Sequence, residues 1–191
     1  MTHAPGFTAI LDANVLYPAP VRDMLLYLAS TELYNPKWTD EIQDEWIRNL
    51  LLNRTDLKRK NLLAAQAAMN DAFPEANITQ YEALITSLSL PDENDRHILA
   101  AAIKDKVDVI VTFNIKDFPV AIVRQFDIEI QHPDYFVSNL IQLDALKALE
   151  AFENQVRNLK NPPKNAQEVL ATLSNAGLIQ SASKLKTLLS I

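Results

Sequence analysis

The side chains that could carry chemistry in this chain of 191 residues are acids and amides. Cysteine is absent, which excludes a thiolate nucleophile, a disulfide and a zinc–thiolate site. The histidines His3, His97 and His132 are isolated and form no HxxxH-type metal pair. The only glycines are Gly6 and Gly177, so there is no glycine-rich loop to cradle a nucleotide phosphate. What remains is oxygen, the ligand that hard cations such as Mg²⁺ and Mn²⁺ prefer.

Three polar residues stand directly after segments that are typical of buried strands. Asp12 follows the apolar run of residues 7–11, and Asn114 and Asp117 follow the β-branched run of residues 107–113. If these strands are parallel, both turns open on the same edge of the sheet, where α/β proteins bind ligands. A structural interpretation also holds, because Asp12 or Asn14 could simply cap the turn.

Two further acids lie on predicted helices. Glu45 shares a helix face with Ile42 and Trp46, and Asp95 begins the most apolar helix of the chain. Each has a structural alternative: a solvated helix acid for Glu45, and an N-cap, a role that Asp92 could also take, for Asp95. Together with Asp12 they form a set of carboxylates that could hold a divalent cation. The other acids of the helix that carries Glu45 are expected to be exposed: Asp40, Glu41 and Asp44.

Strand and helix patterns alternate along most of the chain, and this predicts an α/β fold with a sheet covered on both faces. The predicted strands are residues 7–11, 33–35, 107–113 and 128–131. The predicted helices are residues 21–30, a helix opened by Thr39 and reaching residue 51, and residues 57–69, 81–87, 92–104 and 120–125. After His132 only helices are predicted, over residues 133–159, 166–175 and 181–189, with Gly177 as a C-cap.

Three blocks of the chain resemble the signature blocks of PIN-domain nucleases, especially the branch of bacterial VapC toxins. They read LDANVLYPAPVRD over residues 11–23, TDEIQDEWIRNLL over residues 39–51, and PDENDRHILAAAIKDKVDVIVTFNIKDFP over residues 91–119. The resemblance covers about residues 7–135. It implies a PIN-like three-layer α/β/α sandwich with a mostly parallel central sheet, formed by residues 1–135, and a C-terminal helical extension over residues 136–191.

The resemblance also implies roles for individual residues. Asp12, Glu45 and Asp95 fall on the family's catalytic, metal-binding acids. The family's fourth acid falls two residues after Thr112, where this chain has Asn114, and Asp117 is the alternative at that position. The implied activity is Mg²⁺- or Mn²⁺-dependent cleavage of structured RNA by the toxin of a toxin–antitoxin pair. The implied partners are a small antitoxin, which inserts a basic side chain into the acid cluster, and a second copy of the chain in a homodimer.

Charge and hydropathy indicate which partners and which cellular location to expect for the protein. The net charge of −6 argues against nucleic acid, but basic residues outnumber acids five to one between Trp46 and Ala65. We predict that Arg22, Arg48 and Arg54 contact phosphates. No apolar run approaches the roughly 18 residues that span a bilayer. The N-terminal sequence does not resemble a signal peptide, so a cytoplasmic protein without membrane contact is expected.

Two alternatives to the nuclease stay open. A degenerate PIN fold could bind RNA or a protein without cleavage, which Asn114 in place of an acid favours. A haloacid-dehalogenase-like phosphatase also places an Asp after its first strand, but it needs a second Asp two residues later, where this chain has Asn14. His97 is expected to be a packed helix residue, and Trp38 and Trp46 are expected in the core or at a partner interface.

Overall fold

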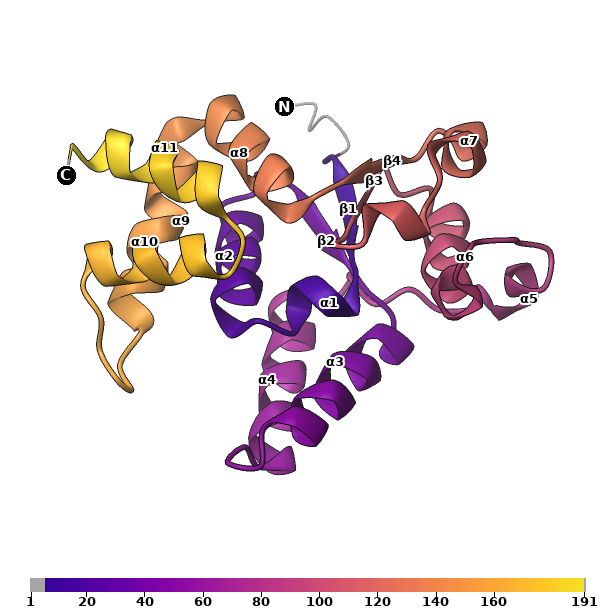
Figure 1. Cartoon of the computed structure of the whole chain (residues 1–191), viewed down its shortest axis with the longest axis horizontal. Helices are drawn as coiled ribbons and strands as arrows, with labels where there is room; N and C mark the ends of the chain where they lie inside the picture. Colours follow the sequence, from indigo (N-terminus) through magenta and orange to yellow (C-terminus); the bar gives the residue numbers. More distant parts are fainter. Residues whose placement is uncertain (1–5, 191) are drawn as a thin grey trace. The chain divides into compact units, whose positions relative to one another are not determined.

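The computed structural model describes residues 6–190, which divide into two compact units (Figure 1). Residues 7–17 and 35–131 form the unit that holds the sheet, and residues 18–34 and 132–190 form a helical unit. His3, the N-terminal five residues and residue 191 lie outside the described residues. The predicted domain boundary between residues 135 and 136 stays a prediction.

The sheet consists of four strands: β1 (Thr8–Leu11), β2 (Asn35–Lys37), β3 (Val109–Val111) and β4 (Glu129–Gln131). Their order is β2-β1-β3-β4 and every neighbouring pair is parallel. In the two central strands Ala9–Leu11 and Val109–Val111 are buried, as the continuous apolar runs predict for strands covered on both faces. The predicted α/β class is confirmed, and the described sheet is wholly parallel.

The sheet unit also contains helices and 3₁₀ turns. The helices are α1 (Ala13–Leu16), α3 (Asp40–Asn53), α4 (Arg59–Ala72), α5 (Glu82–Ile85), α6 (Arg96–Asp105) and α7 (Val120–Val123), with the 3₁₀ turns η1 (Glu93–Asp95), η2 (Ile115–Asp117) and η3 (Arg124–Phe126). The start of α3 is as predicted, because the Thr39 hydroxyl accepts a hydrogen bond from the backbone N–H of Ile42 at 3.1 Å. Trp38 and Trp46 are fully buried, which confirms them as core residues.

The helical unit joins an early segment to the end of the chain. It contains α2 (Ala19–Ser30), α8 (Pro133–Leu143), α9 (Ala145–Asn158), α10 (Ala166–Asn175) and α11 (Ile179–Leu189), and α2 packs against α9 and α10. The ring of Tyr34 meets Phe136 edge to face at 5.0 Å between centroids. Gly177 has a φ of 102° just after α10, so its predicted role in ending that helix is confirmed. Among residues 6–190 no helix is long and apolar enough to cross a membrane.

Two predicted elements differ most from the structure. The second strand is Asn35–Lys37 rather than residues 33–35, so it includes Pro36. Proline is tolerated there because β2 lies at the edge of the sheet, where one side of the strand has no ladder to complete. The predicted helix over residues 133–159 is broken at Asp144, whose carboxylate accepts the backbone N–H groups of Leu146 and Lys147 and begins α9.

A buried carboxylate links two helices of the helical unit. Asp134, at the start of α8, accepts hydrogen bonds from the backbone N–H groups of Gln180 and Ser181, both at 2.9 Å. The Ser181 hydroxyl also lies 2.7 Å from the same carboxylate. These are the unpaired amides of the first turn of α11, so Asp134 stabilises that helix end from a neighbouring helix.

We therefore expect Asp134→Ala to lower the free energy of unfolding by about 2 kcal/mol, because it leaves buried amides without an acceptor. Urea unfolding followed by circular dichroism measures this. The matched control is Glu150→Ala, which removes an exposed acid of α9. Equal stability of the two variants would contradict the expectation.

Candidate active site

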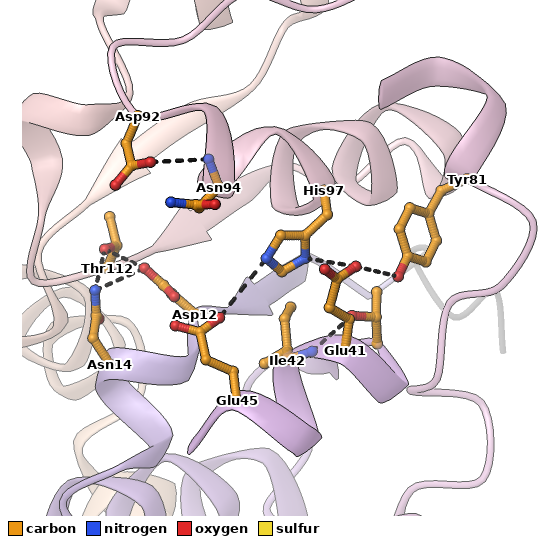
Figure 2. Close-up of polar contacts among 11 residues, drawn as sticks. Asp12, Asn14, Glu41, Ile42, Glu45, Tyr81, Asp92, Asn94, His97 and Thr112 are labelled. Atoms are coloured by element: carbon orange, nitrogen blue, oxygen red, sulfur yellow. Dashed lines mark hydrogen bonds and ion pairs between the residues drawn. The ribbon is translucent and has the colours of Figure 1, made fainter. Parts of the chain in front are cut away.

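Asp12 lies at the carboxyl end of β1, beside Thr112 at the end of β3 (Figure 2). Its backbone N–H continues the parallel ladder with a 3.1 Å bond to the carbonyl oxygen of Val111. The Thr112 hydroxyl donates to Asp12 Oδ2 at 2.7 Å, and the Asn14 amide donates to the same oxygen at 2.7 Å. The Asn14 amide also lies 2.9 Å from the Thr112 hydroxyl, and its oxygen accepts the backbone N–H of Phe113 at 3.0 Å. Asn14 thus ties the turn after β1 to the turn after β3.

The environment of Asp12 works against its negative charge. The residue is only 4% exposed, and burial raises the pKa of its carboxyl group, while the hydrogen bonds from Thr112 and Asn14 act in the opposite direction. Both side-chain donors bind Oδ2, and Oδ1 takes neither of them. Asp12 is therefore a fixed carboxylate with one oxygen held by the fold.

Asp95 lies on η1 just before α6, near enough to Asp12 for the charge of Asp12 to act on it. The capping role falls to Asp92, whose carboxylate accepts the backbone N–H of Asn94 at 2.9 Å, whereas the side chain of Asp95 makes no cap hydrogen bond. Burial, the largest cause, and four negative neighbours together raise the pKa of Asp95 to about 7; the neighbours are Asp12, Asp92, Asp117 and Glu45. The acids predicted from separate parts of the chain therefore act on one another.

Glu45 reaches the same region from α3. Its neighbours Ile42 and Trp46 are fully buried, and this fixes which face of α3 lies against the unit's core. Glu45 itself is half-buried, and its pKa is raised by burial and by the charge of Asp12, with Arg48 acting in the opposite direction. Figure 2 shows Glu45 and Asp12 side by side. The three acids of the predicted set are thus brought together.

The two candidates for the fourth position differ in their setting. Asn114 is exposed, and its backbone N–H donates to the Thr112 hydroxyl at 3.0 Å. Asp117, on η2, is half-buried, and its negative charge is one of those that raise the pKa of Asp95. Of the two residues, Asp117 is the one that adds negative charge to the cluster.

The three arginines predicted to contact RNA are in three different environments. Arg48 is exposed on α3 and acts electrostatically on Glu45. Arg54 is exposed at the end of α3 and forms a two-pronged ion pair with Asp56, at 2.8 and 2.7 Å. Arg22 belongs to the helical unit, where burial lowers the pKa of its guanidinium. Their contact with RNA stays a prediction.

His97 and Glu41 lie near Glu45, and the sequence pattern predicts neither of them as a site residue. His97 is buried on α6, as expected of a packed helix residue, yet its ring lies between two acids of α3 (Figure 2). Nδ1 is 3.6 Å from Glu41 Oε2, and Nε2 is 3.8 Å from Glu45 Oε2. Burial lowers the pKa of His97, with Glu41 acting in the opposite direction. The spacing of Glu41 and Glu45, four residues apart on one helix, is the sequence signal for this arrangement.

The chemistry of the donor set suits a hard divalent cation. Within residues 6–190 no three acidic or histidine side chains are gathered closely enough to enclose an ion. The carboxylates of Asp12, Glu45 and Asp95 nevertheless share a partly buried region in which their pKa values are all raised. A cation would offset both the burial and the mutual repulsion, and carboxylate oxygens are the ligands that Mg²⁺ and Mn²⁺ take.

Comparison with known proteins gives the family. The family model described as PIN domain matches residues 8–116, more than half of the chain, and the chain belongs to the PIN-domain family. A second family model, described as VapC50 C-terminal domain, matches residues 133–187. The protein named "Putative ribonuclease VapC50" from Mycobacterium tuberculosis is 42% identical over 57 residues, which are 29% of this chain and 34% of that protein. The match thus spans about a third of the relative's length, and no solved structure matches.

Proposed function

We propose that this protein is a Mg²⁺- or Mn²⁺-dependent endoribonuclease. The observation that carries the proposal is the arrangement at the carboxyl ends of β1 and β3, where Thr112 and Asn14 hold the buried Asp12 carboxylate and the charges of Asp12, Glu45 and Asp95 act on one another. Titratable groups with strongly perturbed pKa values gather at functional sites more often than elsewhere. Membership of the PIN-domain family and the similarity to a protein named as a ribonuclease support the same activity.

Each acid has a distinct role in this proposal. Asp12 and Asp95 would hold the ion, Glu45 would bind it or orient the attacking water, and Asn114 and Asp117 would complete the rim of the site. Thr112 and Asn14 hold Asp12 by one oxygen, so that its carboxylate keeps one orientation. The chemistry supplied by a bound Mg²⁺ or Mn²⁺ is Lewis acidity toward the phosphodiester and a lowered pKa for water.

The reaction is hydrolysis of a phosphodiester bond. The oxygen of water forms a bond to phosphorus, and the bond from phosphorus to the 3′ oxygen breaks on the opposite side. One fragment keeps a 3′-hydroxyl group, which gains a proton, and the other keeps a 5′-phosphate. In this proposal the half-buried Glu45 accepts a hydrogen bond from the incoming water.

The substrate and partners follow from the same proposal. The substrate is structured RNA, with phosphates bound by Arg48 at the site and by Arg54 and Arg22 elsewhere. The protein acts in the cytoplasm as the toxin of a toxin–antitoxin pair, forms a homodimer and is inhibited by a small antitoxin. The match of residues 133–187 to the VapC50 C-terminal domain supports this assignment. We also propose that residues 1–135 form the nuclease domain and residues 136–191 its helical extension.

Incubation of the purified full chain with end-labelled total RNA tests the proposed function. We expect discrete cleavage with Mn²⁺ or Mg²⁺, none with EDTA, and a 5′-phosphate at the new ends. The variant Asp44→Asn changes an exposed acid next to Glu45 that is not one of the proposed site residues, so it should cleave normally. RNA retained without cleavage under either metal would favour the degenerate binding fold. Hydrolysis of p-nitrophenyl phosphate without RNA cleavage would favour the phosphatase.

A further inference from the structure

The helix α3 presents two acids on one face toward α6. Glu41 and Glu45 are four residues apart, so they are neighbours on the helix surface, where like charges repel. Without another contact this repulsion would favour side-chain orientations in which the two carboxylates separate. The side chain of Glu45 is 34% exposed and that of Glu41 is 55% exposed, so solvent is open to both. Burial of the helix face therefore does not fix the orientation of Glu45.

The imidazole of His97 fills the space between these two acids. Its side chain is 6% exposed, and its two ring nitrogens face one carboxylate each, Nδ1 toward Glu41 at 3.6 Å and Nε2 toward Glu45 at 3.8 Å. Nδ1 is buried and has no hydrogen-bond partner. Since α6 packs into the unit through Ile98 and Leu99, both fully buried, the ring is carried by a rigid part of the fold.

Tyr81 is the fourth residue of this group, and it contacts Glu41. The Tyr81 hydroxyl donates to Glu41 Oε2 at 3.3 Å, the same oxygen that Nδ1 of His97 approaches (Figure 2). Tyr81 is itself buried. Glu41 Oε2 therefore already accepts a hydrogen bond, and Nε2 is the ring nitrogen that faces Glu45.

We propose that His97 is a positioning residue that directs the Glu45 carboxylate toward Asp12 and Asp95 through its Nε2 nitrogen. Glu41 and Tyr81 hold the opposite side of the ring. This inference rests on the proposed function, because the role of Glu45 belongs to it. Outer partners of metal-binding side chains typically contribute about 10–100-fold to metal affinity or activity, so the effect is large enough to measure.

Two amide substitutions separate the two ring nitrogens. The side-chain amide of Gln reaches about as far from the backbone as Nε2 of histidine, and that of Asn reaches about as far as Nδ1. Amides do not titrate between pH 4 and 9, so the comparison of His97→Gln with His97→Asn measures geometry alone. Binding of Mn²⁺ to the metal-free full chain, followed by electron paramagnetic resonance of free Mn²⁺, provides a measurement that is independent of RNA cleavage.

We expect His97→Gln to keep Mn²⁺ affinity and kcat within about threefold, and His97→Asn to lose about 10-fold or more in either. The melting temperatures of the two variants should agree, and Asp44→Asn should bind Mn²⁺ like the unmodified protein. Equal losses in both amide variants, or no loss in either, would mean that His97 only packs. Loss in Gln with retention in Asn would assign the contact to Glu41 and overturn the proposal.

The proposed function and the positioning role fail in different ways. If the unmodified protein binds Mn²⁺ but cleaves no RNA, the nuclease proposal fails, and the order of Mn²⁺ affinities still decides the role of His97. If it cleaves RNA and the two amide variants do not differ, the nuclease stands and the positioning role falls. If it binds no Mn²⁺, both proposals fall.

Discussion

Asp12→Asn is expected to reduce RNA cleavage by roughly 1000-fold or more and, in the same molecule, to raise the melting temperature. The loss follows from removing one negative ligand where the proposed reaction needs a cation and an activated water. The melting temperature is expected to rise because Asp12 is buried and its pKa is raised by that burial, so the ionised form destabilises the fold. An asparagine oxygen can still accept from Thr112 and Asn14, so the turn geometry is kept.

Two measurements on one preparation check this result. Single-turnover cleavage of a labelled RNA gives the activity, and a thermal scan in EDTA gives the melting temperature, for which we expect a rise of about 2–4 °C. Asp108→Asn is a useful control, since that acid binds Thr8 at the other end of β1. Loss of activity together with a lower melting temperature would mean that Asp12 supports the fold rather than the reaction.

In EDTA the protein is expected to lose stability as the pH rises from about 4 to about 7. The pKa of Asp95 is about 7 in the folded chain, against an ordinary value of 3.8 that applies to the unfolded chain. Between pH 3.8 and 7 the folded state therefore binds more protons than the unfolded state. Stability from this group is therefore complete below pH 4 and is lost as the pH approaches 7. The raised pKa values of Asp12 and Glu45 act in the same direction.

Comparison of the unmodified protein with Asp95→Asn isolates this effect. Asp95 is half-buried, so solvent screening reduces it, and we expect the variant to recover about 2–4 °C of melting temperature at pH 8 with little change at pH 4. Saturating Mn²⁺ should remove the difference by stabilising the charged form. Parallel pH profiles of the two proteins would contradict the raised pKa of Asp95.

The part of the site that sequence predicts well is the part set by strand ends. Parallel strands place their carboxyl ends at one edge, so an acid directly after β1 and a threonine at the end of β3 had to meet once the pairing was parallel. Asp12 and Thr112 meet there through a 2.7 Å hydrogen bond. The role of Asn14 is not visible in the same way, because its contacts with Thr112 and Phe113, just after β3, depend on the shape of both turns.

The parts that sequence could not predict depend on contacts between distant segments. Pro36 has no local signal for a strand, since its place at the sheet edge is decided by the pairing of β2 with β1. The helical spacing of apolar residues continues across Asp144, so the sequence gives no sign of a break there. The break after α8 arises because the Asp144 carboxylate caps the start of α9. His97 and Glu41 are 56 positions apart, and only the packing of α6 against α3 brings the ring between the acids.

The helical unit, in which α2 packs against α9 and α10, has a consequence for synthesis on the ribosome. Helix α2 emerges among the first 30 residues, but its partners are translated only after residue 132. The segments of the sheet unit end at residue 131, so they can pair while residues 132–191 are still being made. A nascent chain halted at residue 131 would carry α2 with its apolar face uncovered, a substrate for chaperones and proteases until the final helices arrive.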